Sequence, residues 1–138
     1  MSIQPRGGRF KGDYFTIPLI FTAATNTTRV FAPIFGGTFV STEGDTDVTN
    51  DIPFLIRRLR VVTSVNSVTG DTVVEFRVNG ATMISRTIAT TVVGESASGV
   101  VSLNVASGDM INWALTVTDG AANIVTGAAY IICQRVTE

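Results

Sequence analysis

The amino-acid sequence predicts an all-β protein, a single antiparallel β-sandwich of the jelly-roll type with eight to ten strands. Two dipeptides carry most of this prediction, because Asn79-Gly80 follows the apolar run 72–78 and Asp119-Gly120 follows the apolar run 110–118. Both dipeptides tolerate the positive φ of a type I′ turn, so between apolar runs they indicate hairpins. A third observation is that strand candidates recur at short intervals with no helical pattern between them, as in a sandwich or barrel.

The first half of the domain contains four expected elements before its long central strand. In order they are a strand over 14–21, a small-polar loop over 22–28, a strand over 29–35, and a short strand over 38–41. Pro33 places the second strand at a sheet edge or a bulge, because proline cannot donate to the ladder. Gly36-Gly37 ends that strand, since glycine weakens extended segments.

The second half reads as strands separated by turns. The expected strands cover 54–65, 72–78, 83–93, 100–105, 110–118 and 121–136, with turns around Gly70 and Ser107-Gly108-Asp109. Alternation within 73–78 assigns Val74, Phe76 and Val78 to the core and Val73, Glu75 and Arg77 to the outward face. Gly127 is expected at a bulge or a close backbone approach.

Composition limits the class of partner. The chain has 138 residues, which corresponds to one domain, with a net charge of −1 and only 15% charged residues. This balance predicts no nucleic-acid partner, and no apolar stretch reaches the roughly 18 residues of a membrane span. Low charge with abundant valine and threonine favours a surface buried in an assembly, although strand-rich composition alone also explains it.

The chain divides into an extended N-terminal arm, residues 1–13, and a domain, residues 14–138. The arm includes Arg6, Arg9, Phe10 and Lys11 together with glycines and a proline. Such a segment cannot bury enough apolar surface to fold alone. We therefore expect a neighbouring surface to hold it, either a sister subunit or another protein; packing on its own domain is the alternative.

Catalytic chemistry is poorly represented in the sequence. There is no histidine, and no nucleophile elbow, phosphate loop or metal-ligand cluster is present. Cys133, the only cysteine, lies in an apolar strand and has no histidine to activate it, so we expect a small buried side chain rather than a reactive thiolate. The sequence predicts a protein that is not an enzyme and needs no cofactor.

Two segments, residues 76–80 and 101–113, carry a family resemblance. A strand ending in Asn-Gly is followed later by a small-residue strand, a Gly-Asp turn and a strand that begins with an aliphatic residue, and the apolar strand 130–133 closes the chain. This pattern over residues 54–136 resembles the jelly-roll modules of the tumour necrosis factor and complement globular-head type. Versions of these modules occur in bacteriophage and other virion structural proteins, as decoration proteins, spikes and fibre heads. The resemblance implies a homotrimer packed around a threefold axis.

An acidic loop over 43–51 is the candidate metal site. Asp45, Asp47 and Asp51 could supply hard oxygen ligands for Ca²⁺. The loop lacks the glycine and closing glutamate of the EF-hand pattern, and local turn formation by its aspartates and threonines is the alternative.

Arginines and aromatic residues provide further candidates. Arg57, Arg58 and Arg60 form either a phosphate or partner patch or cross-strand pairs with acidic residues such as Glu75. Strand alternation places Arg58 and Arg60 on one face and Arg57 on the other, with Leu55 and Leu59. Trp113 is either a core residue or a platform for sugar stacking. Phe31, Phe35, Phe39 and Tyr130 are assigned to a core or subunit interface.

The sequence-based hypothesis is a virion structural protein. Its most specific form is a trimeric capsid decoration protein, located in the virion, that stabilises the shell through its arm and its apolar subunit interfaces. The alternative is a receptor- or carbohydrate-binding head domain of a spike or fibre, with loop tips near residues 43–51, 94–99 and 119–123. A cellular ligand of the tumour necrosis factor type is a further alternative, disfavoured by the missing signal peptide, membrane anchor and disulfide.

Overall fold

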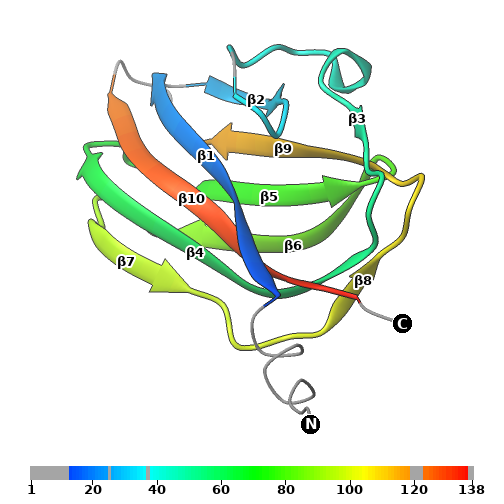
Figure 1. Cartoon of the computed structure of the whole chain (residues 1–138). Helices are drawn as coiled ribbons and strands as arrows, with labels where there is room; N and C mark the ends of the chain where they lie inside the picture. The colour runs from blue at the N-terminus through cyan, green and yellow to red at the C-terminus, as the bar shows by residue number, and fades with distance from the viewer. Residues whose placement is uncertain (1–12, 25, 37, 119–122, 137–138) are drawn as a thin grey trace, which may run out of the picture.

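The protein is a sandwich of two antiparallel β-sheets. The computed structural model describes residues 13–24, 26–36, 38–118 and 123–136, which form ten strands and one short 3-10 helix, η1 (Glu43–Asp45). Sheet A contains β1 (Tyr14–Ala24), β10 (Ile124–Arg135), β4 (Phe54–Asn66), β7 (Gly94–Ala97) and β8 (Leu103–Val105). Sheet B contains β2 (Asn26–Ala32), β9 (Met110–Val117), β5 (Thr72–Val78), β6 (Ala81–Ile88) and β3 (Val48–Thr49). The predicted all-β sandwich is confirmed, and the two sheets are visible as two layers (Figure 1).

The chain passes repeatedly between the two layers. Sheet A has the order β1-β10-β4-β7 and sheet B the order β2-β9-β5-β6. The first and last strands pair along their whole length, from Tyr14 opposite Gln134 to Ala24 opposite Ile124 (Figure 1). β1 has no neighbour on its other side within the described residues, which suits Pro18 in the middle of that strand.

The Asn79-Gly80 hairpin is confirmed. Asn79 has φ 53° and Gly80 has φ 77°, the two positive values that a type I′ turn requires, and β5 pairs with β6 on either side of it. The turn at Gly108, with φ 94°, has a different role, because it connects β8 of sheet A to β9 of sheet B. The Asp119-Gly120 turn lies outside the described residues.

The core fills the space between the sheets. Its largest fully buried side chains include Phe21, Phe54, Phe76 and Trp113, and the rings of Phe76 and Trp113 meet edge to face with centroids 5.2 Å apart. Each large apolar side chain that is buried in this way stabilises the fold by about 1.5–3 kcal/mol.

Several strand boundaries differ from the sequence-based expectation. β1 continues to Ala24 and β2 starts at Asn26, so most of the expected 22–28 loop is strand, while β2 ends at Ala32, directly before Pro33. The segment 38–41 contributes only one isolated bridge, between Phe31 and Val40. The expected 83–93 strand is confirmed over 83–88 and wrong over 89–93, because β6 runs from Ala81 to Ile88 and Thr91, with a positive φ, lies in the turn before β7. The expected 100–105 and 121–136 strands are shorter, as β8 and β10.

Two bulges interrupt the pairing of β4 with β10. One lies where Ile132 pairs with Arg58 and Cys133 pairs with Ile56, which leaves Arg57 as the extra residue. The other leaves Ser64 as the extra residue, next to Gly127. A Cβ atom at Gly127 would lie 2.4 Å from the carbonyl oxygen of Val62, so the expected close backbone approach is confirmed.

Candidate interaction surface

The outer face of sheet A has an apolar end. Ile20 of β1 is 80% exposed, Ala128 of β10 is its cross-strand neighbour, and Val62 of β4, 42% exposed, lies beyond Ala128 in the same row. Val65 and Ile124 extend this group toward the ends of their strands. We call these five residues the apolar end. Their exposure is notable because a sheet face in water normally carries polar side chains.

The other end of the same face carries arginines. Arg60 lies opposite Tyr130 and forms an ion pair with Glu95 of β7. Cross-strand pairing with an acidic residue is therefore confirmed for Arg60, but Glu75 is not the partner, because it lies in sheet B, on the far side of the core. Arg58 lies opposite Ile132, one row further along. We call the part of the face that carries Arg57, Arg58 and Arg60 the arginine end.

Arg57 and Arg58 line one shallow pocket of about 230 Å³. Its other lining residues are Tyr14 of β1, Val100 of the β7–β8 connection and Ile132 of β10. The expectation that Arg57 lies on the opposite face from Arg58 is wrong. The physical reason is the bulge at Arg57, since an extra residue breaks strict alternation and re-aims a side chain.

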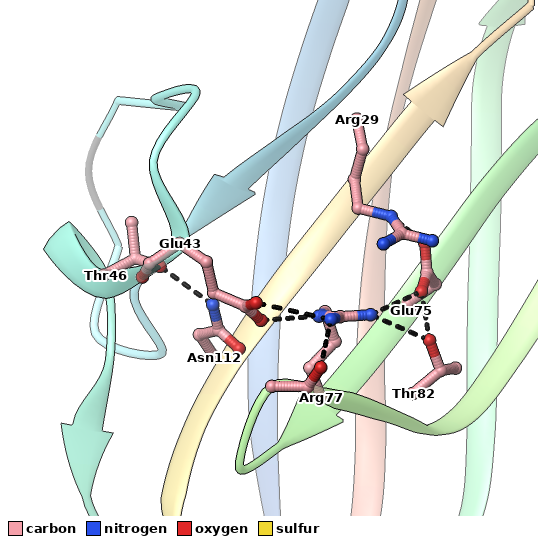
Figure 2. Close-up of polar contacts among 8 residues, drawn as sticks. Arg29, Glu43, Thr46, Glu75, Arg77, Thr82 and Asn112 are labelled. Atoms are coloured by element: carbon pink, nitrogen blue, oxygen red, sulfur yellow. Dashed lines mark hydrogen bonds and ion pairs between the residues drawn. The ribbon is translucent and has the colours of Figure 1, made fainter.

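Buried charges form a network on the outer face of sheet B. Arg77 of β5 is 5% exposed, and its guanidinium donates to both carboxylate oxygens of Glu43 in η1 and, at 3.2 Å, to Glu75 (Figure 2). Glu75 also accepts from Arg29 of β2 at 3.1 Å and from the hydroxyl of Thr82. Glu75 and Arg77 point away from the core, as expected, but both are buried beneath a further segment of the chain.

The cover over this network is the segment between β2 and β3. Thr46, which follows η1, accepts a hydrogen bond of 2.8 Å from the amide of the fully buried Asn112 (Figure 2). The Arg77 guanidinium lies 5.8 Å from the ring centroid of Phe31. The hydrogen bond from Arg77 lowers the pKa of Glu43 below its ordinary value. The network therefore fastens this segment onto sheet B.

The four aromatic residues that the sequence assigned to a core or subunit interface lie at separate places. Phe31 is buried in the network, and Phe39 packs against the core. Phe35 is 79% exposed and borders, with Ile20, a pocket of about 430 Å³ beside β1. Tyr130 is partly buried on the outer face of sheet A. The structure therefore does not gather the four rings at one place.

The acidic loop does not bring its three aspartates together. Asp45 and Asp51 are exposed, whereas Asp47 is partly buried and its Oδ1 atom has no hydrogen-bond partner. Burial and the nearby Glu43 carboxylate raise the pKa of Asp47. Within the described part of the chain, no three acidic, histidine or cysteine side chains are grouped to hold a metal ion.

Two other candidates belong to the core. Trp113 is fully buried, so the hypothesis of a sugar-stacking platform is wrong and the core assignment is confirmed. Cys133 is also fully buried, and its burial raises the pKa of the thiol to about 12. The loop tip expected near residues 94–99 is largely strand β7, and most of the 119–123 tip lies outside the described residues.

The N-terminal arm residues Arg6, Arg9, Phe10 and Lys11 lie outside the described residues as well. No helix in the described ranges is long and apolar enough to cross a membrane.

Comparisons with known proteins give likenesses of fold. No family model matches the sequence, and no curated protein matches it. Among solved structures, the chain is similar to the VP2 subviral particle of infectious bursal disease virus, with 13% identity and a TM-score of 0.38 over 88% of this chain and 33% of VP2. It is also similar to a family 35 carbohydrate-binding module from Clostridium thermocellum, with 12% identity and a TM-score of 0.36 over 86% of this chain and 92% of the module. The chain thus spans about a third of the viral protein.

Proposed function

We propose that this chain is a structural subunit of a virion that assembles with copies of itself, most specifically as a trimeric capsid decoration protein. The observation that carries the proposal is the apolar end of sheet A. Ile20 and Val62 lie in one cross-strand row with the small residue Ala128 between them, and both are exposed in the single chain. Contiguous apolar surface of this kind marks protein contacts.

The fold supports a building role more than a catalytic one. Glu75 and Arg77, the most deeply buried carboxylate and guanidinium in the described residues, are paired with each other. Arg77 also pairs with Glu43 and so fastens a surface segment. The jelly-roll modules that residues 54–136 resemble mostly bind or build. In this proposal the apolar end forms the contact between subunits, and the arm attaches the trimer to a shell protein.

Sedimentation velocity of the full chain tests the assembly. We expect a species with three times the 14.6 kDa of one chain. The double variant I20D/V62D should sediment as a folded monomer, because two carboxylates in an apolar contact cannot be desolvated cheaply. I52D is the matched control, since Ile52 is also exposed and apolar but lies before β4 begins, at the opposite end of that strand from Val65. A wild-type chain that stays monomeric at micromolar concentration would contradict the proposal.

Attachment to the shell is tested separately by deleting residues 1–12. We expect the truncated chain to keep its β circular dichroism spectrum and its oligomeric state but to be lost from particles that retain the full chain. Unchanged recovery with the particles, or loss of the fold, would rule out the arm as the attachment element.

A further inference from the structure

Arg57 and Arg58 are two cations that have no anionic partner in the part of the chain that the structure describes. Among the described residues, the ion pairs of the chain use Arg29, Arg60 and Arg77, and neither Arg57 nor Arg58 has an acidic partner. The Nε atom of Arg58 is shielded from solvent and makes no hydrogen bond there. A shielded guanidinium N–H without an acceptor is unfavourable, so the site is incomplete as it stands.

The fold holds this arginine pair in place. The bulge at Arg57 lets consecutive residues line one pocket, and the carbonyl of Arg57 accepts a 2.8 Å hydrogen bond from the N–H of Val101. That bond ties the β7–β8 connection, which includes the pocket residue Val100, to β4. Bulges commonly re-aim side chains at functional positions. The backbone therefore directs both arginine side chains to the same pocket.

The chemistry of the lining selects an oxyanion. Arginine stays charged at any physiological pH, and its planar fork matches the two oxygens of a carboxylate or phosphate. Tyr14, which is 51% exposed, adds a phenol that can donate a hydrogen bond and a ring that can cover an apolar carrier. The volume of about 230 Å³ admits one such group with a compact carrier.

We propose that the pocket between Tyr14, Arg57, Arg58, Val100 and Ile132 is a binding site for a carboxylate or phosphate group. The group comes either from a small free anion or from an acidic side chain of a neighbouring subunit. The site lies at the opposite end of the face from Ile20 and Val62, so it goes beyond the proposed assembly contact. A free anion would bind without assembly, whereas an acidic side chain of a neighbouring subunit rests on the proposed function.

The test follows the side-chain Nε–H signal of Arg58 in nitrogen-15 NMR spectra of the full chain. Sodium phosphate, and separately sodium glucuronate, is added at constant ionic strength maintained with sodium chloride. We expect a saturable shift of this signal, with affinity reduced at least about fivefold in R57Q, since one of two charge-assisted partners is lost.

R60Q is the matched control. It removes the same charge from the same strand, but Arg60 is paired with Glu95 and does not line the pocket. Binding equal to that of the wild type is expected in R60Q. Equal weakening in R57Q and R60Q would show a general charge effect and overturn the proposal.

Sedimentation velocity distinguishes the two sources of the anion. Phosphate or glucuronate binding with no change in oligomeric state in R57Q/R58Q identifies a free anion. Failure of both probes to bind, together with dissociation of the oligomer in R57Q/R58Q but not in R60Q, identifies a carboxylate of the neighbouring subunit. Failure of both probes with an unchanged oligomeric state in R57Q/R58Q overturns the site, whereas the proposed assembly is judged separately, by the oligomeric states of the wild type and of I20D/V62D.

Discussion

The carboxylate of Glu43 accepts two hydrogen bonds from the guanidinium of Arg77, although 34 positions of sequence separate the two residues. Glu43 lies in the 3-10 helix that follows β2, and Arg77 lies in β5. The pair therefore joins a surface segment to the outer face of sheet B. Both partners are largely withdrawn from water, with 22% of the Glu43 side chain and 7% of the Arg77 side chain exposed.

Removing the Glu43 charge should destabilise the fold. Glu43→Gln leaves the buried Arg77 guanidinium with Glu75 as its one carboxylate partner, and we expect a loss of about 1–3 kcal/mol in the free energy of unfolding. Urea denaturation of the variant measures this. Asp45→Asn is the matched control, since Asp45 is an exposed neighbour in the same short helix and should change stability by less than about 0.5 kcal/mol.

Acid should weaken the same contact. The pKa of Glu43 is lowered below 4.5 by its hydrogen bond to Arg77, so its stabilising contribution is fully present above pH 4.5 and is lost as the pH falls through the lower pKa of the folded state. The stability difference between the wild type and Glu43→Gln should therefore shrink as the pH is lowered from 7 toward 3. A constant difference over that range would show that the carboxylate charge does not matter.

Asp47 should behave in the opposite way. Burial and Glu43 raise its pKa above 3.8, so the charged form is disfavoured in the folded state and stability is reduced at neutral pH. We expect Asp47→Asn to stabilise the protein at pH 7 by about 1 kcal/mol or less, the scale of one unmade polar contact. The gain should disappear as the pH falls through the raised pKa toward 3.8. Destabilisation at pH 7 would contradict this account.

Gly127 should not tolerate a side chain. A Cβ atom there would meet the Val62 carbonyl oxygen at 2.4 Å and the Phe21 ring at 3.0 Å, both in well-packed strands. Gly127→Ala should cost about 1–3 kcal/mol, as overpacking does, and should lower the melting temperature. Gly99→Ala is the control, because nothing lies within 4 Å of the position that its methyl group would take and its backbone is not left-handed.

The Cys133 thiol should be inert in the native protein. Its pKa of about 12 and its full burial leave almost no thiolate at pH 8, and the thiolate is the reactive form. Labelling with iodoacetamide should be slow in buffer and fast in concentrated urea. Rapid labelling of the folded protein would show that β10 opens readily, because the side chain points into the core.

Turn chemistry made the fold class predictable. A type I′ turn requires a positive φ at both central residues, and few residue pairs other than Asn-Gly accept it. The hairpin at Asn79-Gly80 was therefore predictable from two neighbouring residues. Alternation in 73–78 also located the core face correctly at Val74 and Phe76. In contrast, the break between β6 and β7 depends on the positive φ of Thr91, a conformation that threonine rarely adopts, and the sequence does not mark it.

The candidate sites were less predictable, because each depends on contacts between distant segments. The sequence indicated that Arg57, Arg58 and Arg60 were a cluster, but alternation misplaced Arg57, since a bulge depends on how β4 and β10 align. Similarly, nothing local to Glu75 and Arg77 signals that η1 covers them. The exposed row of Ile20 and Val62 could not be seen either, because the two residues come from strands on either side of β10.

The sequence by itself determined the extended strands, the Asn-Gly hairpin and the buried aromatic core, because these follow from the conformational preferences and polarity of neighbouring residues. Only the tertiary structure decided which charges are covered, which apolar side chains remain exposed, and that two consecutive arginines share a pocket. Those properties depend on strand order and on register across the sheets, which are set by long-range packing rather than by any one segment of the chain.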